Sequence, residues 1–293
     1  MLVKGADWFV EGSSGIAMKF KIPQLVIGLT IVAMGTSAPE AAVSVTAALK
    51  GNAAITVGNI VGSNIINILI ILGTSALITP LAIAKSTVRI EIPFMIAVTL
   101  MLLGFGYNGT ISLWEGITLL VAFAVYLGYL FVLAKEGKNK NEENIKEISV
   151  FKALIGTAVG LFLIVYGSDV TVDAATKIAQ GLGLSERFIG LTIVALGTSL
   201  PELFTSVSAA RKGNADIAIG NIVGSNIFNI LLVIGISASI VPVPFVPGFR
   251  FDTIISLVAA VLILLCTIKD RKLKRWVGAL MLLTYAAYFF FIW

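Results

Sequence analysis

Long apolar stretches recur along the whole chain, separated by short polar breaks. A stretch of roughly 20 apolar residues crosses about 30 Å of hydrocarbon as an α-helix, whereas the strands of a membrane barrel would be about ten residues long and alternating. The pattern therefore predicts an all-α polytopic membrane protein with ten transmembrane helices. The predicted spans cover about residues 1–19, 23–49, 54–78, 88–106, 111–134, 151–180, 185–211, 216–240, 251–268 and 273–292.

The composition supports lipid as the solvent of this chain. Of the 293 residues, 58% are hydrophobic and only 13% are charged, against about a quarter charged in soluble proteins. A water-facing surface of this size would need more charged residues. Histidine is absent and Cys266 is the only cysteine, so the sequence offers no disulfide, no thiolate cluster and no imidazole base.

The chain contains two copies of one sequence at a constant offset of 162 residues. Residues 28–40 read GLTIVAMGTSAPE, and residues 190–202 read GLTIVALGTSLPE. Residues 58–68 read GNIVGSNIINI, and residues 220–230 read GNIVGSNIFNI. Matches of this length at one offset indicate a tandem duplication.

A hydrophilic segment separates the two copies. Residues 135–147 read KEGKNKNEENIKE and present no apolar face. We expect a first five-helix repeat at 1–134, a cytoplasmic linker at 135–150 and a second five-helix repeat at 151–293.

An odd number of spans in each copy places the second copy upside down relative to the first. The sequence therefore predicts the inverted-topology repeat that is typical of secondary transporters. The alignment of the copies also puts Met1 opposite Leu163, which lies well inside the sixth span. The first helix is therefore expected to be truncated at its N-terminus.

Lysine and arginine predict the orientation in the membrane. Loops after the even spans carry four of them, Lys50, Lys177, Arg187 and Arg250. Sixteen lie after the odd spans: Lys19, Lys21, Lys85, Arg89, Lys135, Lys138, Lys140, Lys146, Lys152, Arg211, Lys212, Lys269, Arg271, Lys272, Lys274 and Arg275. This bias predicts a multi-pass cell (plasma) membrane protein with a cytoplasmic linker and both termini outside. It also explains the net charge of +5, and no nucleic acid is expected as a partner.

Glu40 and Glu202 lie midway through the second and seventh predicted spans. A charge at the bilayer centre costs about 2.5–3.5 kcal/mol on insertion scales. Each glutamate could be neutral or paired with a basic residue, but none lies at a comparable depth in the predicted spans. We therefore interpret both glutamates as parts of a cation pathway.

A proline precedes each glutamate. Pro39 and Pro201 lack an amide hydrogen and clash with the carbonyl group four residues back, so each GTS-x-PE segment is expected to break its helix at mid-membrane. The break would expose carbonyl oxygens and place the glutamate in the first turn of the next half-helix. Four hydroxyl side chains lie beside the two breaks: Thr36, Ser37, Thr198 and Ser199.

The third and eighth spans share the pattern G-x-x-G-S-N-x-x-N. Ser63 and Asn67 are four residues apart and share a helix face, as do Ser225 and Asn229, and we favour these four as cation ligands. Four further asparagines could instead hydrogen-bond helices together, a role that polar residues often have in membranes. These are Asn59, Asn64, Asn221 and Asn226.

Inversion of one copy on the other would bring the polar segments together at the bilayer centre. Their donors are all oxygen atoms, which hard cations such as Na⁺ and Ca²⁺ prefer. Two carboxylates balance one divalent ion or two monovalent ions. Competition of the two ions for one site would then be the physical basis of exchange.

The two GTS-x-PE segments and the two GNIVGSN-x-x-N segments resemble the α-repeats of the cation/Ca²⁺ exchanger superfamily, in particular prokaryotic sodium/calcium antiporters. The resemblance covers nearly the whole chain. It implies ten helices, an oxygen cage between spans two, three, seven and eight, and sliding of spans one and six during alternating access. The ligands it implies are Glu40, Glu202, Thr36, Ser37, Thr198, Ser199, Ser63, Ser225, Asn67 and Asn229.

One position departs from this pattern. Many prokaryotic and the potassium-dependent members carry aspartate where this chain has Asn229. The departure leaves two carboxylates and weakens a potassium-coupled interpretation. Proton-coupled members carry a different sequence around the glutamate, which disfavours proton coupling; it is kept as an alternative, as is potassium coupling.

The leading hypothesis is therefore a secondary antiporter of Na⁺ and Ca²⁺, with no cofactor and no obligatory protein partner. A passive cation channel is an alternative, although an inverted repeat with an occluded cage is unusual for a channel. An intramembrane enzyme lacks catalytic partners for its carboxylates. A carrier of organic anions is disfavoured by two glutamates and no buried cation.

Overall fold

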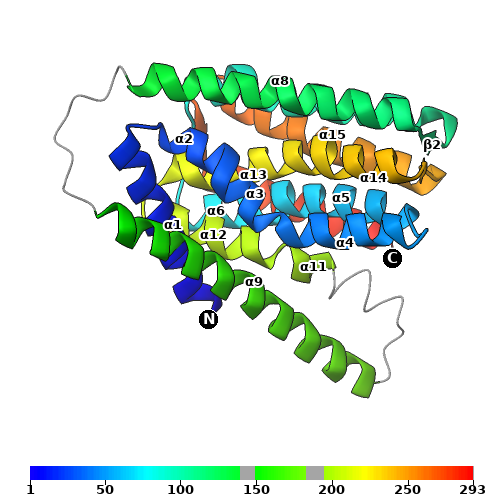
Figure 1. Cartoon of the computed structure of the whole chain (residues 1–293), viewed down its shortest axis with the longest axis horizontal. Helices are drawn as coiled ribbons and strands as arrows, with labels where there is room; N and C mark the ends of the chain where they lie inside the picture. The colour runs from blue at the N-terminus through cyan, green and yellow to red at the C-terminus, as the bar shows by residue number, and fades with distance from the viewer. Residues whose placement is uncertain (139–148, 183–194, 293) are drawn as a thin grey trace.

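The computed structural model describes residues 1–138, 149–182 and 195–292 of the chain, and almost all of them are helical (Figure 1). In the first part the elements are α1 (Leu2–Phe20), α2 (Gln24–Ile27), η1 (Gly28–Val32), α3 (Ala33–Thr36), α4 (Ala38–Leu49), α5 (Ala54–Ile66), η2 (Asn67–Leu72), α6 (Gly73–Ile78), β1 (Leu81–Ala82), η3 (Thr87–Glu91), α7 (Ile92–Phe105), η4 (Gly106–Asn108), β2 (Thr110–Ile111) and α8 (Leu113–Lys138).

The second part has a closely matching order. Its elements are α9 (Val150–Gly181), α11 (Ala195–Thr198), α12 (Leu200–Arg211), α13 (Ala215–Phe228), η6 (Asn229–Ile234), α14 (Gly235–Ile240), β3 (Val243–Pro244), α15 (Pro247–Thr267), β4 (Lys272–Leu273) and α16 (Arg275–Ile292). Here η1, η2, η3 and η6 are π-helical and η4 is a 3₁₀ turn.

The helices agree in class with the all-α membrane protein that the sequence predicts. Within the described residues, six helices are long and apolar enough to cross a membrane, and a bent pair of shorter helices makes a seventh. Helices also form at the predicted first and tenth spans, as α1 and α16. Part of the predicted span at 185–211 lies outside the described residues.

The helix of the fifth span extends a few residues into the hydrophilic sequence. Helix α8 continues to Lys138, although the hydrophilic linker was expected to begin at residue 135. A solvated helix end needs no apolar face, so a polar sequence alone does not end a helix. Most of the predicted linker, residues 139–148, lies outside the described residues.

Matching elements of the two copies run in opposite directions. Helices α4 and α12 correspond at the offset of 162 residues, and so do η2 and η6. In Figure 1, α5 lies to the right of α6 whereas α13 lies to the left of α14. Helices α3 and α4 run left to right, and α11 and α12 run right to left.

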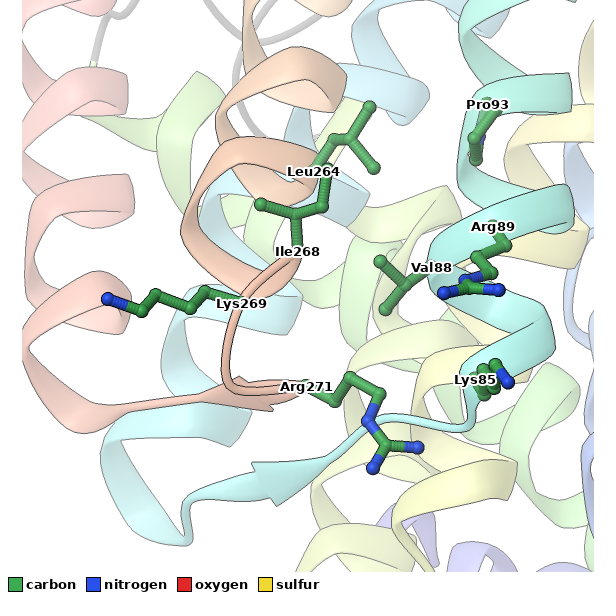
Figure 2. A pocket seen from close by; sticks show the side chains of 8 residues that line it. All are labelled: Lys85, Val88, Arg89, Pro93, Leu264, Ile268, Lys269 and Arg271. Carbon is green, nitrogen blue, oxygen red and sulfur yellow. The ribbon is translucent and has the colours of Figure 1, made fainter.

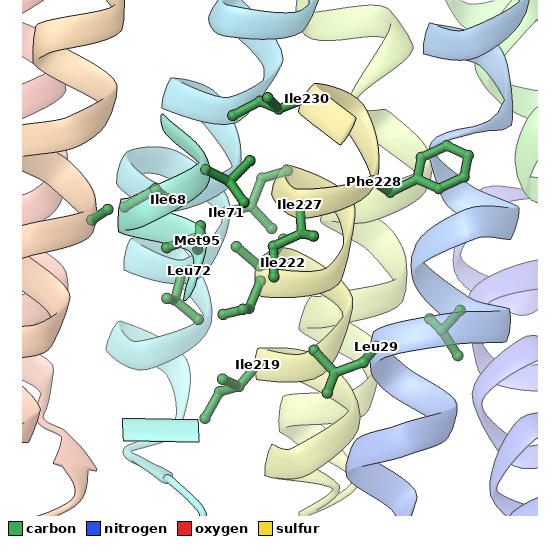
Figure 3. Packing of buried hydrophobic residues seen from close by; sticks show 14 of the residues in the cluster. Leu29, Ile68, Ile71, Leu72, Met95, Ile219, Ile222, Ile227, Phe228 and Ile230 are labelled. Atoms are coloured by element: carbon green, nitrogen blue, oxygen red, sulfur yellow. The ribbon is translucent and has the colours of Figure 1, made fainter. Parts of the chain in front are cut away.

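The second copy's α13–α14 helix lies at the centre of the molecule. Its most apolar stretch is 94% buried by protein, compared with 22% for α8. Figure 3 shows Ile222 and Ile227 of α13 between Leu29 of η1 and the side chains of η2 and α7. Because lipid chains are as apolar as these side chains, close van der Waals packing holds such helices together.

Glycine permits the closest of these approaches. A β-carbon on Gly224 would lie 2.8 Å from the α-carbon of Leu29, and one on Gly220 would lie 3.0 Å from the α-carbon of Gly28. Small residues at the contact thus let the backbone of α13 approach η1 directly.

Helices α1 and α9 form a second close pair. Gly12 faces Ala153 and Thr157, and Gly5 faces Gly160, so the two helices run antiparallel. At its other side, α1 is joined to the end of α12, because the Lys212 Nζ atom lies 2.7 Å from Glu11 Oε1.

Two short strand pairs join the copies at their loops. Strand β1 pairs with β4 and β2 pairs with β3, both antiparallel. Each pair therefore takes one strand from each copy, and the offset of 162 residues converts one pair into the other.

The glycine contacts lead to a stability prediction. We expect Gly224→Ala to lower the free energy of unfolding by about 1–3 kcal/mol, since the new methyl group overpacks the contact with Leu29. Gly128→Ala on the exposed face of α8, where a β-carbon meets nothing within 4 Å, should be neutral or stabilise by up to about 1 kcal/mol. Unfolding in detergent micelles measures both variants, and equal stabilities would contradict the packing argument.

Candidate cation-binding site

The predicted breaks before the two glutamates are present. Helix α3 ends at Thr36, α4 begins at Ala38, and the two are bent by 49°. Pro39 lies in the first turn of α4, where its missing amide hydrogen costs nothing, and Glu40 follows it. The same arrangement recurs in the second copy, with a break at Ser199 and Glu202 in the first turn of α12.

A backbone feature of the third and eighth spans was not predicted. Asn67 is the first residue of the π-helical turn η2, and Asn229 is the first residue of η6. Such turns often mark functional sites in helices. No proline or other local signal marks them in the sequence, because the π-turn depends on packing against neighbouring helices.

Each buried glutamate meets a serine of the other copy. The Ser37 hydroxyl donates to Glu202 Oε1 over 2.7 Å. The Ser199 hydroxyl lies 3.4 Å from Glu40 Oε1 and can donate to it. Ser63 approaches the same oxygen at 3.5 Å and lies 3.3 Å from Ser199. Both glutamate side chains are fully buried, so the two breaks and α5 enclose them together.

Four asparagines form a reciprocal group where α5 and α13 meet. The Asn67 amide donates to Asn226 Oδ1 at 3.0 Å, and the Asn229 amide donates to Asn64 Oδ1 at 3.1 Å. Asn64 and Asn226 each donate to the other's backbone carbonyl at 3.3 Å. These hydrogen bonds fix the side-chain amides of Asn67 and Asn229 through their nitrogen atoms and leave their oxygen atoms outside the group.

On the two central glutamates and the two asparagines that begin η2 and η6, four buried oxygen atoms have no hydrogen-bond partner among the described residues. They are Glu40 Oε2, Glu202 Oε2, Asn67 Oδ1 and Asn229 Oδ1. All four are acceptors, and a buried acceptor that lacks a donor costs about 1–3 kcal/mol, or more if it is charged. The glutamate charges also repel each other, and in the described part of the chain no lysine or arginine pairs with either.

The remaining predicted ligands hold the neighbouring helices. The Thr36 hydroxyl donates to Asn221 Oδ1 at 3.0 Å, and the Ser225 hydroxyl donates to the Ala33 carbonyl at 3.4 Å. Thr198 ends α11 directly before Ser199. These residues therefore line the two breaks beside the glutamates.

The four asparagines whose role was left open have structural contacts. The Asn59 amide donates to Ser44 Oγ at 3.0 Å, and the Asn221 amide donates to Ser206 Oγ at 2.9 Å. These bonds tie α5 to α4 and α13 to α12. Asn64 and Asn226 instead orient the asparagines at the start of η2 and η6. The helix-bonding interpretation thus fits all four.

A third buried carboxylate lies outside this group. Glu91 of η3 is fully buried and accepts a hydrogen bond from the Tyr129 hydroxyl of α8. Sequence reasoning did not single it out, although a glutamate inside a predicted apolar span was a usable signal.

Comparison with known proteins decides the family. The model of the family described as "Sodium/calcium exchanger protein" matches residues 1–132 and 152–293. The chain belongs to the sodium/calcium exchanger family. Its members are transporters rather than enzymes, so the chain is a polytopic antiporter of the cation/Ca²⁺ exchanger superfamily.

Individual relatives agree over nearly the whole chain. A putative antiporter, CaxA, of Alkalimonas amylolytica is 38% identical and matches 98% of this chain and 94% of its own length. The sodium/calcium exchanger MaX1 of Methanosarcina acetivorans is 34% identical, with 98% and 94% covered. A solved structure of the sodium-calcium exchanger NCX_Mj superposes with a TM-score of 0.87 at 35% identity, covering 98% of this chain and 93% of that one.

The buried Glu91 leads to a stability prediction. Tyr129→Phe removes the hydroxyl that donates to the Glu91 carboxyl and should destabilise the exchanger by about 1–3 kcal/mol. Addition of Glu91→Leu should recover part of this loss, because both polar partners are then gone. Tyr107→Phe, at a side chain that is 76% exposed, is the control. Unfolding in micelles tests this, and a neutral Tyr129→Phe would contradict a buried pair.

Proposed function

We propose that the chain exchanges Na⁺ for Ca²⁺ across the membrane at a site between its two copies. The observation that carries the proposal is the group of four buried acceptor oxygens on Glu40, Glu202, Asn67 and Asn229. Carboxylate, amide and hydroxyl oxygens suit hard cations. A hydrogen-bond donor or a buried lysine would satisfy the same oxygens, but the described residues place neither there.

The proposed ligand set comes from both copies. The glutamates and asparagines supply the four oxygens without partners, and Ser37, Ser63 and Ser199 lie against the carboxylates. Carbonyl and hydroxyl oxygens at the two helix breaks complete it. The proposed ligands are Glu40, Glu202, Thr36, Ser37, Thr198, Ser199, Ser63, Ser225, Asn67 and Asn229.

The charge of this site supports exchange rather than co-transport. Asn67 and Asn229 are neutral, so Glu40 and Glu202 provide the formal charge of the proposed ligand set. One Ca²⁺ or two Na⁺ ions neutralise these carboxylates, and both loads together would leave excess positive charge in a medium of low dielectric constant. The binding of one ion therefore expels the other, which is the thermodynamic requirement of an antiporter.

We further propose that access to the site alternates between the two sides. Ten spans arranged as two inverted five-helix repeats, 1–134 and 151–293, fit the opposite directions of α5–α6 and α13–α14. The pair α1–α9 packs through glycines such as Gly12 and Gly160, and small residues give a smooth surface for sliding. The bias of basic residues supports a plasma-membrane protein with a cytoplasmic linker at 135–150 and both termini outside.

The two central carboxylates give the first functional prediction. Glu40→Gln or Glu202→Gln should reduce calcium/sodium exchange at least 100-fold, because each removes half of the charge that balances Ca²⁺. Glu136→Gln, on the exposed end of α8, removes the same charge outside the site and should retain wild-type exchange. Flux into proteoliposomes measures all three, with micelle unfolding as the check on folding. Wild-type rates in either central variant would refute the site.

Coupling of calcium transport to sodium gives the second functional prediction. Proteoliposomes loaded with Na⁺ should accumulate ⁴⁵Ca²⁺ from a sodium-free medium, and equal Na⁺ on both sides should abolish accumulation. Replacement of internal Na⁺ by K⁺ or by a proton gradient should not support uptake. Uptake that is indifferent to the sodium gradient would point to a channel, and uptake driven by K⁺ or H⁺ would replace sodium with that ion.

A further inference from the structure

A groove of about 640 Å³ opens between the start of the α7 segment (residues 85–105, which include η3) and the end of α15. It is lined by Lys85, Val88, Arg89, Pro93, Leu264, Ile268, Lys269 and Arg271. Figure 2 shows that Arg271 reaches toward Lys85 and that Arg89 lies one turn further along the helix, whereas Lys269 extends to the other side. Three cationic side chains therefore lie at one end of the groove, two from the α7 side and one from the loop after α15.

These cations are not neutralised by neighbouring acids. In the described part of the chain, none of the lining lysines and arginines forms an ion pair. Asp270 lies next to Arg271 in the sequence but pairs with Lys274, whose hydrogen bond and charge lower the pKa of the Asp270 carboxyl. Glu91 lies two residues from Arg89, but its carboxyl is buried against Tyr129. The basic end of the groove therefore carries positive charge that an anion could neutralise.

The backbone around the groove holds the cations in place. The strand pair β1–β4 aligns Ala82 with Lys272, and the Ile83 amide donates to the Arg271 carbonyl at 2.9 Å. Arg271 itself has a left-handed backbone with φ of 50°, an uncommon conformation for a residue other than glycine. The ladder thus fixes the loop of Arg271 beside the start of the α7 segment.

The rest of the groove is apolar. Pro93 lies one helical turn beyond Arg89, and Leu264 lies one turn before Ile268, so both extend the groove away from its basic end along transmembrane helices. Figure 2 shows these two side chains above the cationic ones. Charge at one end and aliphatic surface at the other match the headgroup and the acyl chain of a phospholipid.

The fold itself does not require this charge. At the offset of 162 residues, the counterparts of Lys85, Arg89 and Arg271 are Pro247, Phe251 and Gly109. At that other end of the molecule, Arg250 is already engaged, since it donates to the Tyr107 carbonyl at 2.8 Å. A general preference for basic residues on one side would add charge at helix ends, but it would not gather unpaired cations in a cavity.

We propose that this groove binds the phosphate-bearing headgroup of an anionic phospholipid through Lys85, Arg89 and Arg271. The acyl chain lies against Pro93 and Leu264. The lipid bridges α7 of the first copy and α15 of the second, which contact each other below it. This site is independent of ion exchange, because it requires only that the two helices lie in a bilayer.

The test is lipid binding to the purified full chain in an uncharged detergent, followed by native mass spectrometry. The probes are dioctanoyl phosphatidylglycerol, dioctanoyl phosphatidylcholine and glycerol 3-phosphate. The anionic lipid should bind the wild-type chain at least tenfold more tightly than the variant Lys85→Gln/Arg89→Gln/Arg271→Gln. The zwitterionic lipid should not distinguish the two proteins. Glycerol 3-phosphate should bind far more weakly, because it lacks the acyl chains.

A matched control removes the same charge elsewhere. Lys19→Gln/Lys21→Gln/Lys152→Gln neutralises three basic residues after odd spans, and Lys21, like Arg271, has a left-handed backbone. This variant should bind phosphatidylglycerol within twofold of wild type. The charge-conserving variant Lys85→Arg/Arg89→Lys/Arg271→Lys should keep binding, which separates loss of charge from misfolding.

Three results would overturn the proposal. One is equal binding of phosphatidylglycerol by the wild-type chain and the groove variant. Another is an equal loss in the control variant, which would indicate a diffuse charge effect. The third is glycerol 3-phosphate binding as tight as that of the lipid, which would make the groove a site for a soluble phosphate.

Discussion

The structure depends on the burial of two carboxylates in a protein that has lipid for a solvent. Glu40 and Glu202 are fully buried, and lipid offers them neither water nor a counter-ion. Polar groups at this depth must be satisfied internally. The helix breaks place these carboxylates, and the serines that cross between the copies bond to them. The partners nevertheless leave acceptor oxygens unsatisfied, and the proposed cation would satisfy them.

Reciprocal contacts between the two copies form the candidate site. Ser37 of one copy bonds Glu202 of the other, and Ser199 approaches Glu40 in return. The asparagines and the strand pairs follow the same reciprocal rule. Each glutamate contacts a serine of the other copy, so the proposed ligand set requires both copies. In the proposed alternating-access mechanism, a relative displacement of one copy or of α1 and α9 opens the site without unfolding any helix.

The two copies are similar at the centre of the molecule but differ at its two ends. The centre is similar in both copies, whereas one end of the molecule carries a basic groove and the corresponding end carries Pro247, Phe251 and Gly109. In the proposed mechanism, the ligand set is almost symmetric because the ion reaches it from both sides of the membrane. The surrounding bilayer and its aqueous faces are not equivalent, and surface residues have diverged accordingly.

The helices, the duplication and the helix breaks could be predicted from the sequence, because a chain surrounded by lipid can adopt few kinds of structure. Apolar length determined where helices form, the duplication determined that there are two matched sets of polar residues, and Pro39 and Pro201 determined where two helices break. Local covalent chemistry and solvent are sufficient for these features. The sequence also pointed to the glutamates, serines and asparagines of the candidate site.

Only the tertiary structure decided which side-chain oxygen atoms accept a hydrogen bond and which have no partner. Asn67 and Asn64 are the same residue type in the sequence. Packing of α5 against α13 nevertheless lets the Asn64 oxygen accept a hydrogen bond from Asn229 and leaves the Asn67 oxygen unpaired. The burial of Glu91 against Tyr129 and the groove that Lys85 and Arg271 line likewise join segments far apart in the chain, and the π-turns depend on such packing. No local pattern encodes such contacts, because their geometry arises from helix packing.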